Sequence, residues 1–208
     1  MATKSELRKK FIEFRKSISK EYLLAAEEKL LNLVVSYKDY FKSQKIACYW
    51  SIGNEMPTQK LIQYLAGLDS AIYLPTVAED SKMMKFCLLE DHQDLKANIY
   101  NILEPVDTPE IDPSDLDIIL LPCVCFDEKG YRIGMGKGYY DYSLSDLNNT
   151  STELIVIAFE FQKIDDCLHG NHDVKANSCI TDEYFYIFDY IITLKRLCKL
   201  SFAFHPKI

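Results

Sequence analysis

The sequence predicts an α/β protein, a three-layer α/β/α sandwich around a mostly parallel sheet. Short apolar segments alternate along the chain with amphipathic segments of helical period. Two of them, "LDIILLP" (116–122) and "LIVIAF" (154–159), are apolar almost throughout, as expected for central parallel strands that helices cover on both faces. With 208 residues and 48% hydrophobic content, the chain can bury one full core, so we expect a single domain over 1–208.

The first part of the chain is predicted to be helical. Apolar residues recur at helical spacing from Leu7 to Ile18, and Ser5 is a residue type that caps helix N-termini, which predicts an amphipathic helix over about 5–17. Ser19 is placed to cap a second helix. That helix carries a broad apolar face of leucines and valines between Leu23 and Val35.

Strands and a further helix follow. "KIACYW" (45–50) is typical of a buried strand, and the segment after Pro57 is expected to be helical, because proline is favoured in a first helical turn. "AIYLP" (71–75) and "MMKFCLL" (83–89) indicate short strands.

The second half contains a long loop and the remaining strands. The polar stretch 91–113 holds three prolines and is expected to be a surface loop. After the strand at 116–122 and a glycine-rich loop, a helix is predicted through about Leu147. "YFYIFDYIITL" (184–194) is expected to form a last strand near a sheet edge, and the basic tail after Lys195 carries no motif.

Composition excludes several classes of protein. The net charge of −7 argues against a nucleic-acid-binding or membrane surface. The N-terminus is charged from Lys4 onward, unlike a secretory signal, and the longest apolar run, 118–126, is too short to span a bilayer. The seven cysteines are scattered and form no C-x-x-C pair, which favours reduced thiols in a cytoplasmic protein over a zinc site.

The segment "RIGMGKGYYD" (132–141) is the strongest candidate for a functional loop. Gly134, Gly136 and Gly138 stand at alternate positions. Arg132 precedes them, and Lys137 lies between the last two. Such glycines can present backbone N–H groups to an anion, and the cations would add favourable charge. The segment matches neither the Walker loop nor the G-x-G-x-x-G fingerprint. A tight turn without a ligand is an equally good interpretation of the glycines alone.

Two carboxylates extend the hypothesis of a phosphate site. Asp141 follows the glycine loop and is well placed to hold a magnesium ion that bridges phosphates, although it would also complement a helix dipole without any metal. Glu55 follows the buried strand at 45–50 and could orient a polar heterocycle. Its simpler interpretation is a solvated loop carboxylate.

The whole chain resembles the 5-formyltetrahydrofolate cyclo-ligase family. That family writes the loop as L-P-x-x-x-F-D-x-x-G-x-R-[LI]-G-[RM]-G-x-G-[YF]-Y-D, and this chain has "LPCVCFDEKGYRIGMGKGYYD" (121–141). Further matches follow the same order along the chain: "KSELR" near the start, "NEMPT" after the first strand, "NILEP" (101–105), "AFEFQ" (158–162) and "HDVKANSCIT" (172–181).

The resemblance implies a reaction and its participants. ATP and 5-formyltetrahydrofolate give 5,10-methenyltetrahydrofolate, ADP and phosphate, with Mg²⁺ as cofactor. The formyl oxygen attacks the γ-phosphate, which makes a phosphorylated, imidate-like intermediate at N5, and N10 then closes the ring as phosphate leaves. Phosphoryl transfer needs charge neutralisation and positioning more than a protein nucleophile. The expected partners are therefore ATP and the folate, for a monomeric enzyme without nucleic-acid or membrane partners.

The resemblance also implies roles for individual residues. Lys137 and Arg132 are implied as the catalytic cations, and Asp141 and Asn177 as the metal ligands. The positions implied to contact ATP are Lys4, Arg8, Arg132, Gly134, Met135, Gly136, Lys137, Gly138 and Tyr139. The positions implied to contact the folate are Trp50, Glu55, Tyr100, Tyr139 and Tyr140.

The chain departs from the family pattern at several positions. Cys123 stands where glycine is common, and Met135 where arginine is common. Asn177 replaces an aspartate that can help to hold the metal, so the resemblance leaves the metal affinity open. Thr76 stands where many relatives have arginine, which leaves the glutamate tail of the folate without an obvious cationic partner.

Two other functions compete with that of an active cyclo-ligase. One is a folate- or nucleotide-binding protein of the same fold without turnover, which the joint presence of Glu55, Lys137 and Asp141 disfavours. The other is an α/β enzyme acting on sugar phosphates. That chemistry would need an acid–base pair in the cleft, for which the sequence shows no motif.

Overall fold

In the computed structural model, which describes residues 2–78, 81–90 and 95–189, the predicted α/β class is confirmed. The helices are α1 (Lys4–Ser17), α2 (Lys20–Ser36), α3 (Lys38–Phe41), α4 (Gln59–Ala66) and α5 (Tyr139–Ser143), with 3₁₀ turns η1 (Pro113–Asp115), η2 (Ser145–Asn149) and η3 (Glu160–Gln162). The strands are β1 (Lys45–Ala47), β2 (Ala71–Val77), β3 (Met84–Leu88), β4 (Lys96–Ala97), β5 (Leu103–Glu104), β6 (Glu110–Ile111), β7 (Ile118–Pro122), β8 (Cys125–Asp127), β9 (Arg132–Ile133), β10 (Glu153–Ile157), β11 (Lys163–Ile164), β12 (Ser178–Ile180) and β13 (Phe185–Ile187).

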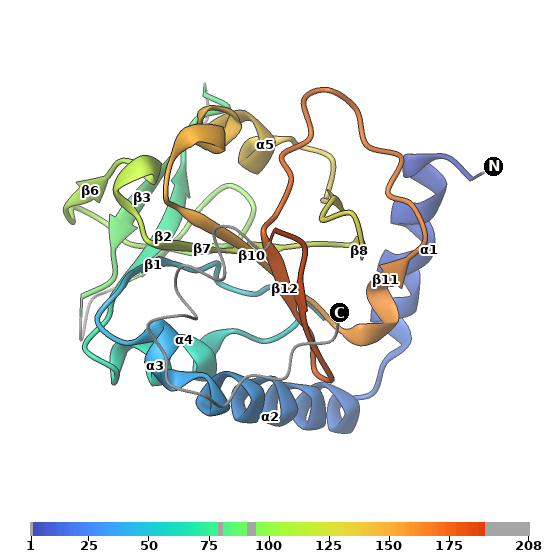
Figure 1. Cartoon of the computed structure of the whole chain (residues 1–208), viewed down its shortest axis with the longest axis horizontal. Helices are drawn as coiled ribbons and strands as arrows, with labels where there is room; N and C mark the ends of the chain where they lie inside the picture. Colours follow the sequence, from blue (N-terminus) through green and yellow to red (C-terminus); the bar gives the residue numbers. More distant parts are fainter. Residues whose placement is uncertain (1, 79–80, 91–94, 190–208) are drawn as a thin grey trace.

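The central sheet is mostly parallel. Its order is β13-β12-β10-β7-β1-β2-β3-β6, and the five strands from β12 to β2 run parallel. Strands β13, β3 and β6 join antiparallel at the two edges. Helices α2, α3 and α4 lie on one face of this sheet and α5 on the other (Figure 1). The three layers follow because a sheet that is apolar on both faces needs a cover on each.

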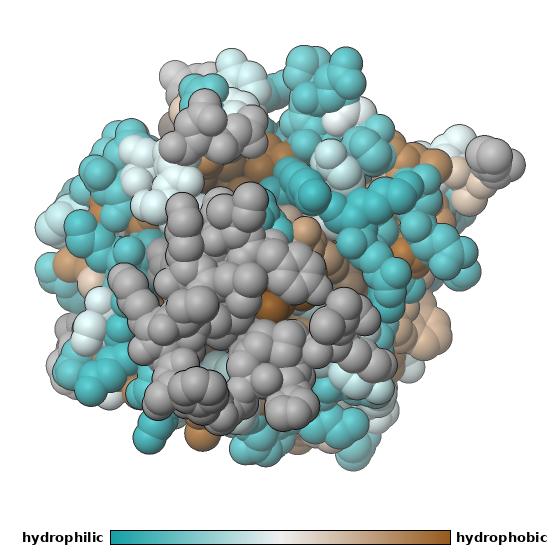
Figure 2. All heavy atoms as spheres, in the orientation of Figure 1, coloured by the Kyte–Doolittle hydropathy of each residue, from teal (hydrophilic) through white to brown (hydrophobic). Residues whose placement is uncertain are grey.

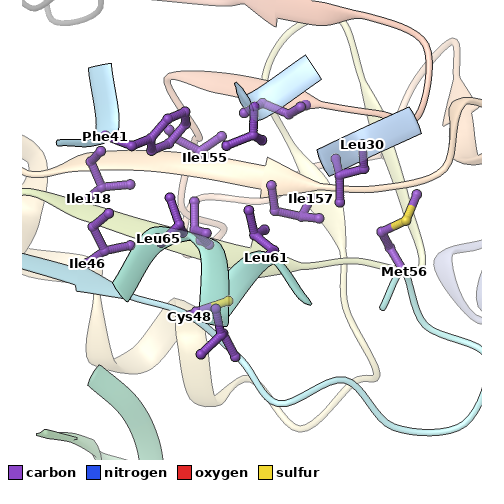
Figure 3. Packing of buried hydrophobic residues seen from close by; sticks show 14 of the residues in the cluster. Leu30, Phe41, Ile46, Cys48, Met56, Leu61, Leu65, Ile118, Ile155 and Ile157 are labelled. Atoms are coloured by element: carbon purple, nitrogen blue, oxygen red, sulfur yellow. The ribbon is translucent and has the colours of Figure 1, made fainter. Parts of the chain in front are cut away.

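The side chains of β7 show how the two faces are filled. Ile118 and Leu120 point into the cluster beneath α2 and α4, while Ile119 and Leu121 belong to the cluster beneath α5. This alternation is the period of two that a strand imposes on its side chains. In the first cluster, Leu30 of α2 and Leu65 of α4 pack against the isoleucines of β1, β7 and β10 (Figure 3).

The first two helices each begin after a residue whose hydroxyl accepts a capping hydrogen bond. Helix α1 begins one residue earlier than predicted, because Thr3 and not Ser5 is the N-cap. Thr3 forms a capping box with Glu6. Ser19 caps α2 as predicted, and its hydroxyl accepts a hydrogen bond from the N–H of Tyr22. Helix α4 follows Pro57, with Thr58 as its N-cap.

Several predicted elements are shorter or different in the structure. The strand predicted over 45–50 ends at Ala47, and the predicted loop 91–113 contains the short strands β4, β5 and β6. The helix predicted through Leu147 changes to the 3₁₀ turn η2 after Ser143. Strand β13 covers 185–187 of the predicted 184–194, of which 190–194 lies outside the described residues.

Two features were not predicted. Strand β12 pairs with β10 and β13, and a separate three-stranded sheet of β11, β8 and β9 frames the glycine loop. Helix α1 packs against this small sheet, where Phe11 contacts Val124 and Ile133 in a third apolar cluster. The small sheet and α1 together fix the position of the loop.

Surface and burial agree with the composition. On the face drawn in Figure 2, hydrophilic residues dominate the coloured surface, and hydrophobic residues show mainly in the recesses between them. The six cysteines in the described part of the chain are all free and buried. Within residues 2–78, 81–90 and 95–189, no helix has the length and apolar character needed to cross a bilayer.

Candidate functional site

A cavity of about 500 Å³ opens at the carboxyl ends of β1 and β7. Parallel α/β sheets bind their ligands at this edge. Helix α1, the glycine loop, β2 and the segment around β5 complete its walls. The predicted site residues that line it are Lys4, Arg8, Trp50, Glu55, Tyr100, Arg132, Gly134, Met135, Gly136, Lys137, Gly138, Tyr139, Tyr140 and Asp141. Asn177 is not among them.

One end of the cavity is formed by the glycine loop and by two cations of α1. Lys4 and Arg8 are four residues apart and therefore lie on the same face of the helix. Nε of Arg8 donates a hydrogen bond to the carbonyl oxygen of Gly134 at 2.8 Å. Helix α1 thus holds the loop and adds positive charge beside it. Lys137 is exposed, with Nζ 5.8 Å from the ring centroid of Tyr100.

The glycines of the loop have different explanations. Gly136 and Gly138 have φ of +91° and +76°, in the left-handed region that side chains disfavour. A Cβ on Gly136 would also lie 3.2 Å from Cζ of Arg8. Gly134 has no such φ, and a Cβ there would meet nothing within 4 Å. Folding therefore explains the glycines at 136 and 138, whereas a side chain at 134 would occupy open space in the cavity.

Two carboxylates lie at the same end, each paired with a cation. Oδ1 of Asp141 is 3.1 Å from Arg132 and accepts a hydrogen bond from the N–H of Val174 at 3.2 Å. Asp173 forms an ion pair with Lys4 and accepts from the N–H of Gly170 at 2.6 Å. Burial raises the pKa of Asp173, but the hydrogen bonds from Lys4 and Gly170 outweigh it and leave the pKa below its usual value.

Asn177 takes a structural position. Its Oδ1 accepts a hydrogen bond from the N–H of Leu154 at 2.7 Å, and its own N–H donates to the carbonyl of Leu154 at 2.8 Å. The side chain therefore ties the start of β10 to the segment before β12. The structure brings Asp173 to the cavity instead. The motif "HDVKANSCIT" contains both residues, so the sequence indicated this segment but not which of the two residues lines the cavity.

The other end of the cavity is built around Glu55. Its side chain is 11% exposed, which rules out a solvated loop carboxylate. Oε2 accepts a hydrogen bond from the N–H of Ile52 at 3.2 Å, and Oε1 lies 3.8 Å from a guanidinium nitrogen of Arg15. Burial raises the pKa of Glu55, while the charge of Arg15 and the hydrogen bond from Ile52 oppose the rise. Arg15 was not predicted as a site residue.

Aromatic rings line the walls between the two ends. The hydroxyls of Tyr100 and Tyr139 lie 3.0 Å apart, and their rings meet edge to face at 6.1 Å between centroids. Tyr140 lies deeper, and burial raises its pKa. Trp50 joins them from the segment after β1. Flat apolar walls with a few polar groups suit a planar heterocycle.

The remaining departures from the family pattern differ in position. Cys123 lines the cavity with its thiol buried, and Met135 lines it from the glycine loop. Thr76 lies between two lining residues of β2, and its hydroxyl is 3.6 Å from the sulfur of Cys87 on β3. Thr76 therefore offers a hydroxyl in place of a cation beside this wall of the cavity.

Fold and site together define an α/β protein whose cavity joins a glycine loop flanked by cations to a largely buried carboxylate among aromatic rings. The sequence profile of the 5-formyltetrahydrofolate cyclo-ligase family matches residues 1–182. The chain belongs to this family, which confirms the predicted family and the enzyme class.

Relatives and solved structures agree. The chain is 30% identical over 152 residues to the 5-formyltetrahydrofolate cyclo-ligase of Haemophilus influenzae, covering 72% of this chain and 81% of that protein. It is 32% identical over 160 residues to the Saccharomyces cerevisiae enzyme of the same name, covering 68% and 75%. The NMR structure of Aquifex aeolicus 5,10-methenyltetrahydrofolate synthetase superposes with a TM-score of 0.78 at 29% identity, covering 89% of this chain and 92% of that one.

Proposed function

We propose that this enzyme uses ATP to cyclise 5-formyltetrahydrofolate to 5,10-methenyltetrahydrofolate, with release of ADP and phosphate. The observation that carries the proposal is the polarity of the cavity. Cations and open backbone lie at one end, and a buried carboxylate among aromatic rings lies at the other. This arrangement suits two substrates that meet in the middle, one rich in phosphate and one planar.

The phosphates of ATP are assigned to the glycine loop. Lys4, Arg8 and Lys137 supply positive charge there, and the open space beside Gly134 admits a close approach to backbone N–H groups. Arg132 is buried and already holds Asp141 and the carbonyl of Val174, the latter at 3.0 Å. We therefore assign Arg132 to positioning Asp141 as well as to the charge of the site.

The donor set at this end fits magnesium. Mg²⁺ is bound through one or two carboxylates together with substrate phosphates and waters, and both Asp141 and Asp173 line the cavity. In each, one carboxylate oxygen makes no hydrogen bond to a described residue. Asp141 and Asp173 are the proposed ligands, in place of Asn177. The ion would neutralise phosphate charge, and the paired Lys4 would then be released toward ATP.

The pterin is assigned to Glu55. An ionised carboxylate accepts hydrogen bonds from the ring N–H and amino groups and so fixes the orientation of the heterocycle. Trp50, Tyr100, Tyr139 and Tyr140 would cover its faces. The formyl group on N5 then points along the cavity toward the γ-phosphate.

The chemistry follows from this placement. The formyl oxygen attacks the γ-phosphorus as the bond to ADP breaks, which turns a poor leaving group into a phosphate ester. N10 adds to the activated carbon, loses its proton, and expels phosphate to leave the methenyl bridge. Lys137 and Arg8 stabilise the charge that develops in the transfer. The remaining rate acceleration comes from holding the formyl group and the γ-phosphate in the right geometry at the two ends of the cavity.

A spectrophotometric assay tests the proposal. With magnesium and 5-formyltetrahydrofolate, methenyl product should form only when ATP is added, with one ADP released for each product. Binding of both ligands without product would leave a binding protein of the same fold. Product without ATP would exclude the phosphorylated intermediate.

A further inference from the structure

Arg15 is a buried cation that does not itself line the cavity. The residue is 7% exposed, although arginine is rarely buried unless it is paired. It lies on the same stripe of α1 as Lys4 and Arg8, eleven residues after Lys4 and seven after Arg8. The helix therefore directs three cations toward one site, and Arg15 is the one furthest from the glycine loop.

The contacts of Arg15 join three segments of the cavity wall. Its guanidinium is 3.8 Å from Oε1 of Glu55, donates to the carbonyl of Cys123 at 3.3 Å, and contacts the sulfur of Met135 at 3.9 Å. Its backbone carbonyl accepts a hydrogen bond from the side chain of Asn54 at 2.6 Å. Glu55 is the one carboxylate within 4.0 Å of Arg15 in the described part of the chain.

The geometry leaves Glu55 available to a ligand. At 3.8 Å the guanidinium neutralises the carboxylate without forming a close hydrogen bond. A carboxylate offers about four acceptor positions, and Ile52 occupies one of them. The charged and titratable groups that face Glu55 are Arg15 from α1, Tyr49 after β1, Cys123 after β7 and Tyr140 of α5.

We propose that Arg15 is a positioning residue that keeps Glu55 ionised and aimed into the cavity, and so sets the pH range in which the enzyme binds its folate. The inference rests on the proposed function. Burial alone would favour the neutral acid, which loses an acceptor that the pterin needs. Among the described residues, Arg15 supplies the positive charge that opposes this, since Tyr49, Cys123 and Tyr140 carry none.

Folate binding without ATP or magnesium tests the role of Arg15. Trp50 is the single tryptophan of the chain and lines the cavity, so its fluorescence reports the binding. A raised pKa makes the carboxylate protonate at higher pH. In wild type, the Kd for 5-formyltetrahydrofolate should therefore rise as the pH falls through the pKa of Glu55. In Arg15→Met this rise should begin about one pH unit higher, equal to about tenfold weaker binding within that range.

Matched variants separate positioning from folding. The rise in Kd at low pH is called the acid limb. Arg15→Lys keeps the charge and should shift the acid limb less than Arg15→Met does. Lys16→Met removes an exposed charge from the same helix and should leave the limb in place. In a Glu55→Gln background, where residue 55 does not titrate, Arg15→Met should not change the pH dependence of folate binding. If Arg15→Met does not fold, Arg15→Gln, which also removes the charge, decides the question.

The outcomes are distinct. An acid limb that stays unmoved in Arg15→Met or Arg15→Gln, with folate binding retained, would overturn the inference alone. A wild type that binds no 5-formyltetrahydrofolate would overturn the proposed function as well. Equal weakening by Arg15→Lys at every pH would make Arg15 a packing residue only.

Discussion

The two ends of the cavity handle charge in opposite ways. At the glycine loop, each acid is paired closely with a cation, as in Arg132 with Asp141 at 3.1 Å and Lys4 with Asp173. At the other end, Glu55 and Arg15 remain 3.8 Å apart and both are buried. Under the proposed function, the Lys4–Asp173 pair at the first end separates when phosphate and metal bind. The second holds a single charge ready for hydrogen bonds.

This difference suits the two ligands of the proposed function, a polyanion and a planar heterocycle. The Lys4–Asp173 pair is partly exposed, so water or phosphate can replace either partner at little cost, whereas Arg132 is buried against Asp141. A buried carboxylate must instead be preorganised, because an unpaired buried charge is costly. The predictions below separate the two ends, from the largest expected effect to the smallest.

Lys137→Ala should affect the phosphate end most. Losing one donor that stabilises transition-state charge typically costs about 100- to 1,000-fold in turnover. We expect a loss of at least about 100-fold in kcat/KM for ATP. Steady-state kinetics with varied ATP would measure it. Lys129→Ala, which removes an exposed lysine paired with Asp166, is the matched control and should behave as wild type. Near-normal ATP kinetics in Lys137→Ala would place this lysine outside the mechanism.

Glu55→Gln should affect the folate end alone. Hydrogen bonds to a charged group are worth about 1.5–3 kcal/mol, or roughly ten- to a hundredfold in affinity. We expect kcat/KM for 5-formyltetrahydrofolate to fall by that factor, while the KM for ATP and the melting temperature stay unchanged. Glu110→Gln, on an exposed carboxylate of β6, serves as control. Weaker ATP binding in Glu55→Gln would mean that the two ends have been assigned the wrong way round.

Asp141→Asn and Asp173→Asn should each weaken the binding of magnesium. Metal affinity depends on the number of charged ligands, so we expect the apparent Mg²⁺ affinity to fall by about tenfold, with partial recovery at high magnesium. The dependence of activity on magnesium concentration checks this. Asn177→Asp, at the position first predicted from the sequence, should leave that dependence unchanged because residue 177 faces Leu154. A tighter dependence in that variant would return the metal to Asn177.

Gly134→Ala and Gly136→Ala should separate ligand space from backbone strain. Alanine at 134 meets no atom and should leave stability unchanged, while the KM for ATP rises by about threefold or more if phosphate lies against this backbone. Alanine at 136 must adopt a left-handed φ beside Arg8, at a cost of about 1–2 kcal/mol of stability. Thermal melts and ATP kinetics on both variants decide. Unchanged ATP kinetics in Gly134→Ala would leave the open space without a ligand.

Much of the fold could be predicted, because long elements carry their pattern in the sequence. Helix α1 and strand β7 differ from their predicted ranges by one or two residues. Strand β12, with three residues, and the strands of the small sheet, with two or three each, are too short to show a period. Their pairing is set by tertiary contacts instead.

The candidate site could be predicted only in part. A long specific motif located the glycine loop, and the structure brings it together with Glu55 and α1. The partners Arg15 and Asp173 were missed for a physical reason. An ion pair such as Arg15 with Glu55 joins residues forty positions apart, and only the packed helix brings them together. Arginine at a helical spacing that faces the core was nevertheless a signal, because burial of an arginine demands a partner.

Equilibrium binding of 5-formyltetrahydrofolate in the absence of ATP tests the division of the cavity most directly. The fluorescence of Trp50 would report the Kd for wild type, Lys137→Ala and Glu55→Gln under one set of conditions. The account predicts the same Kd for wild type and Lys137→Ala, and a Kd at least about tenfold higher for Glu55→Gln. Folate binding that Lys137→Ala weakens and Glu55→Gln leaves intact would contradict it.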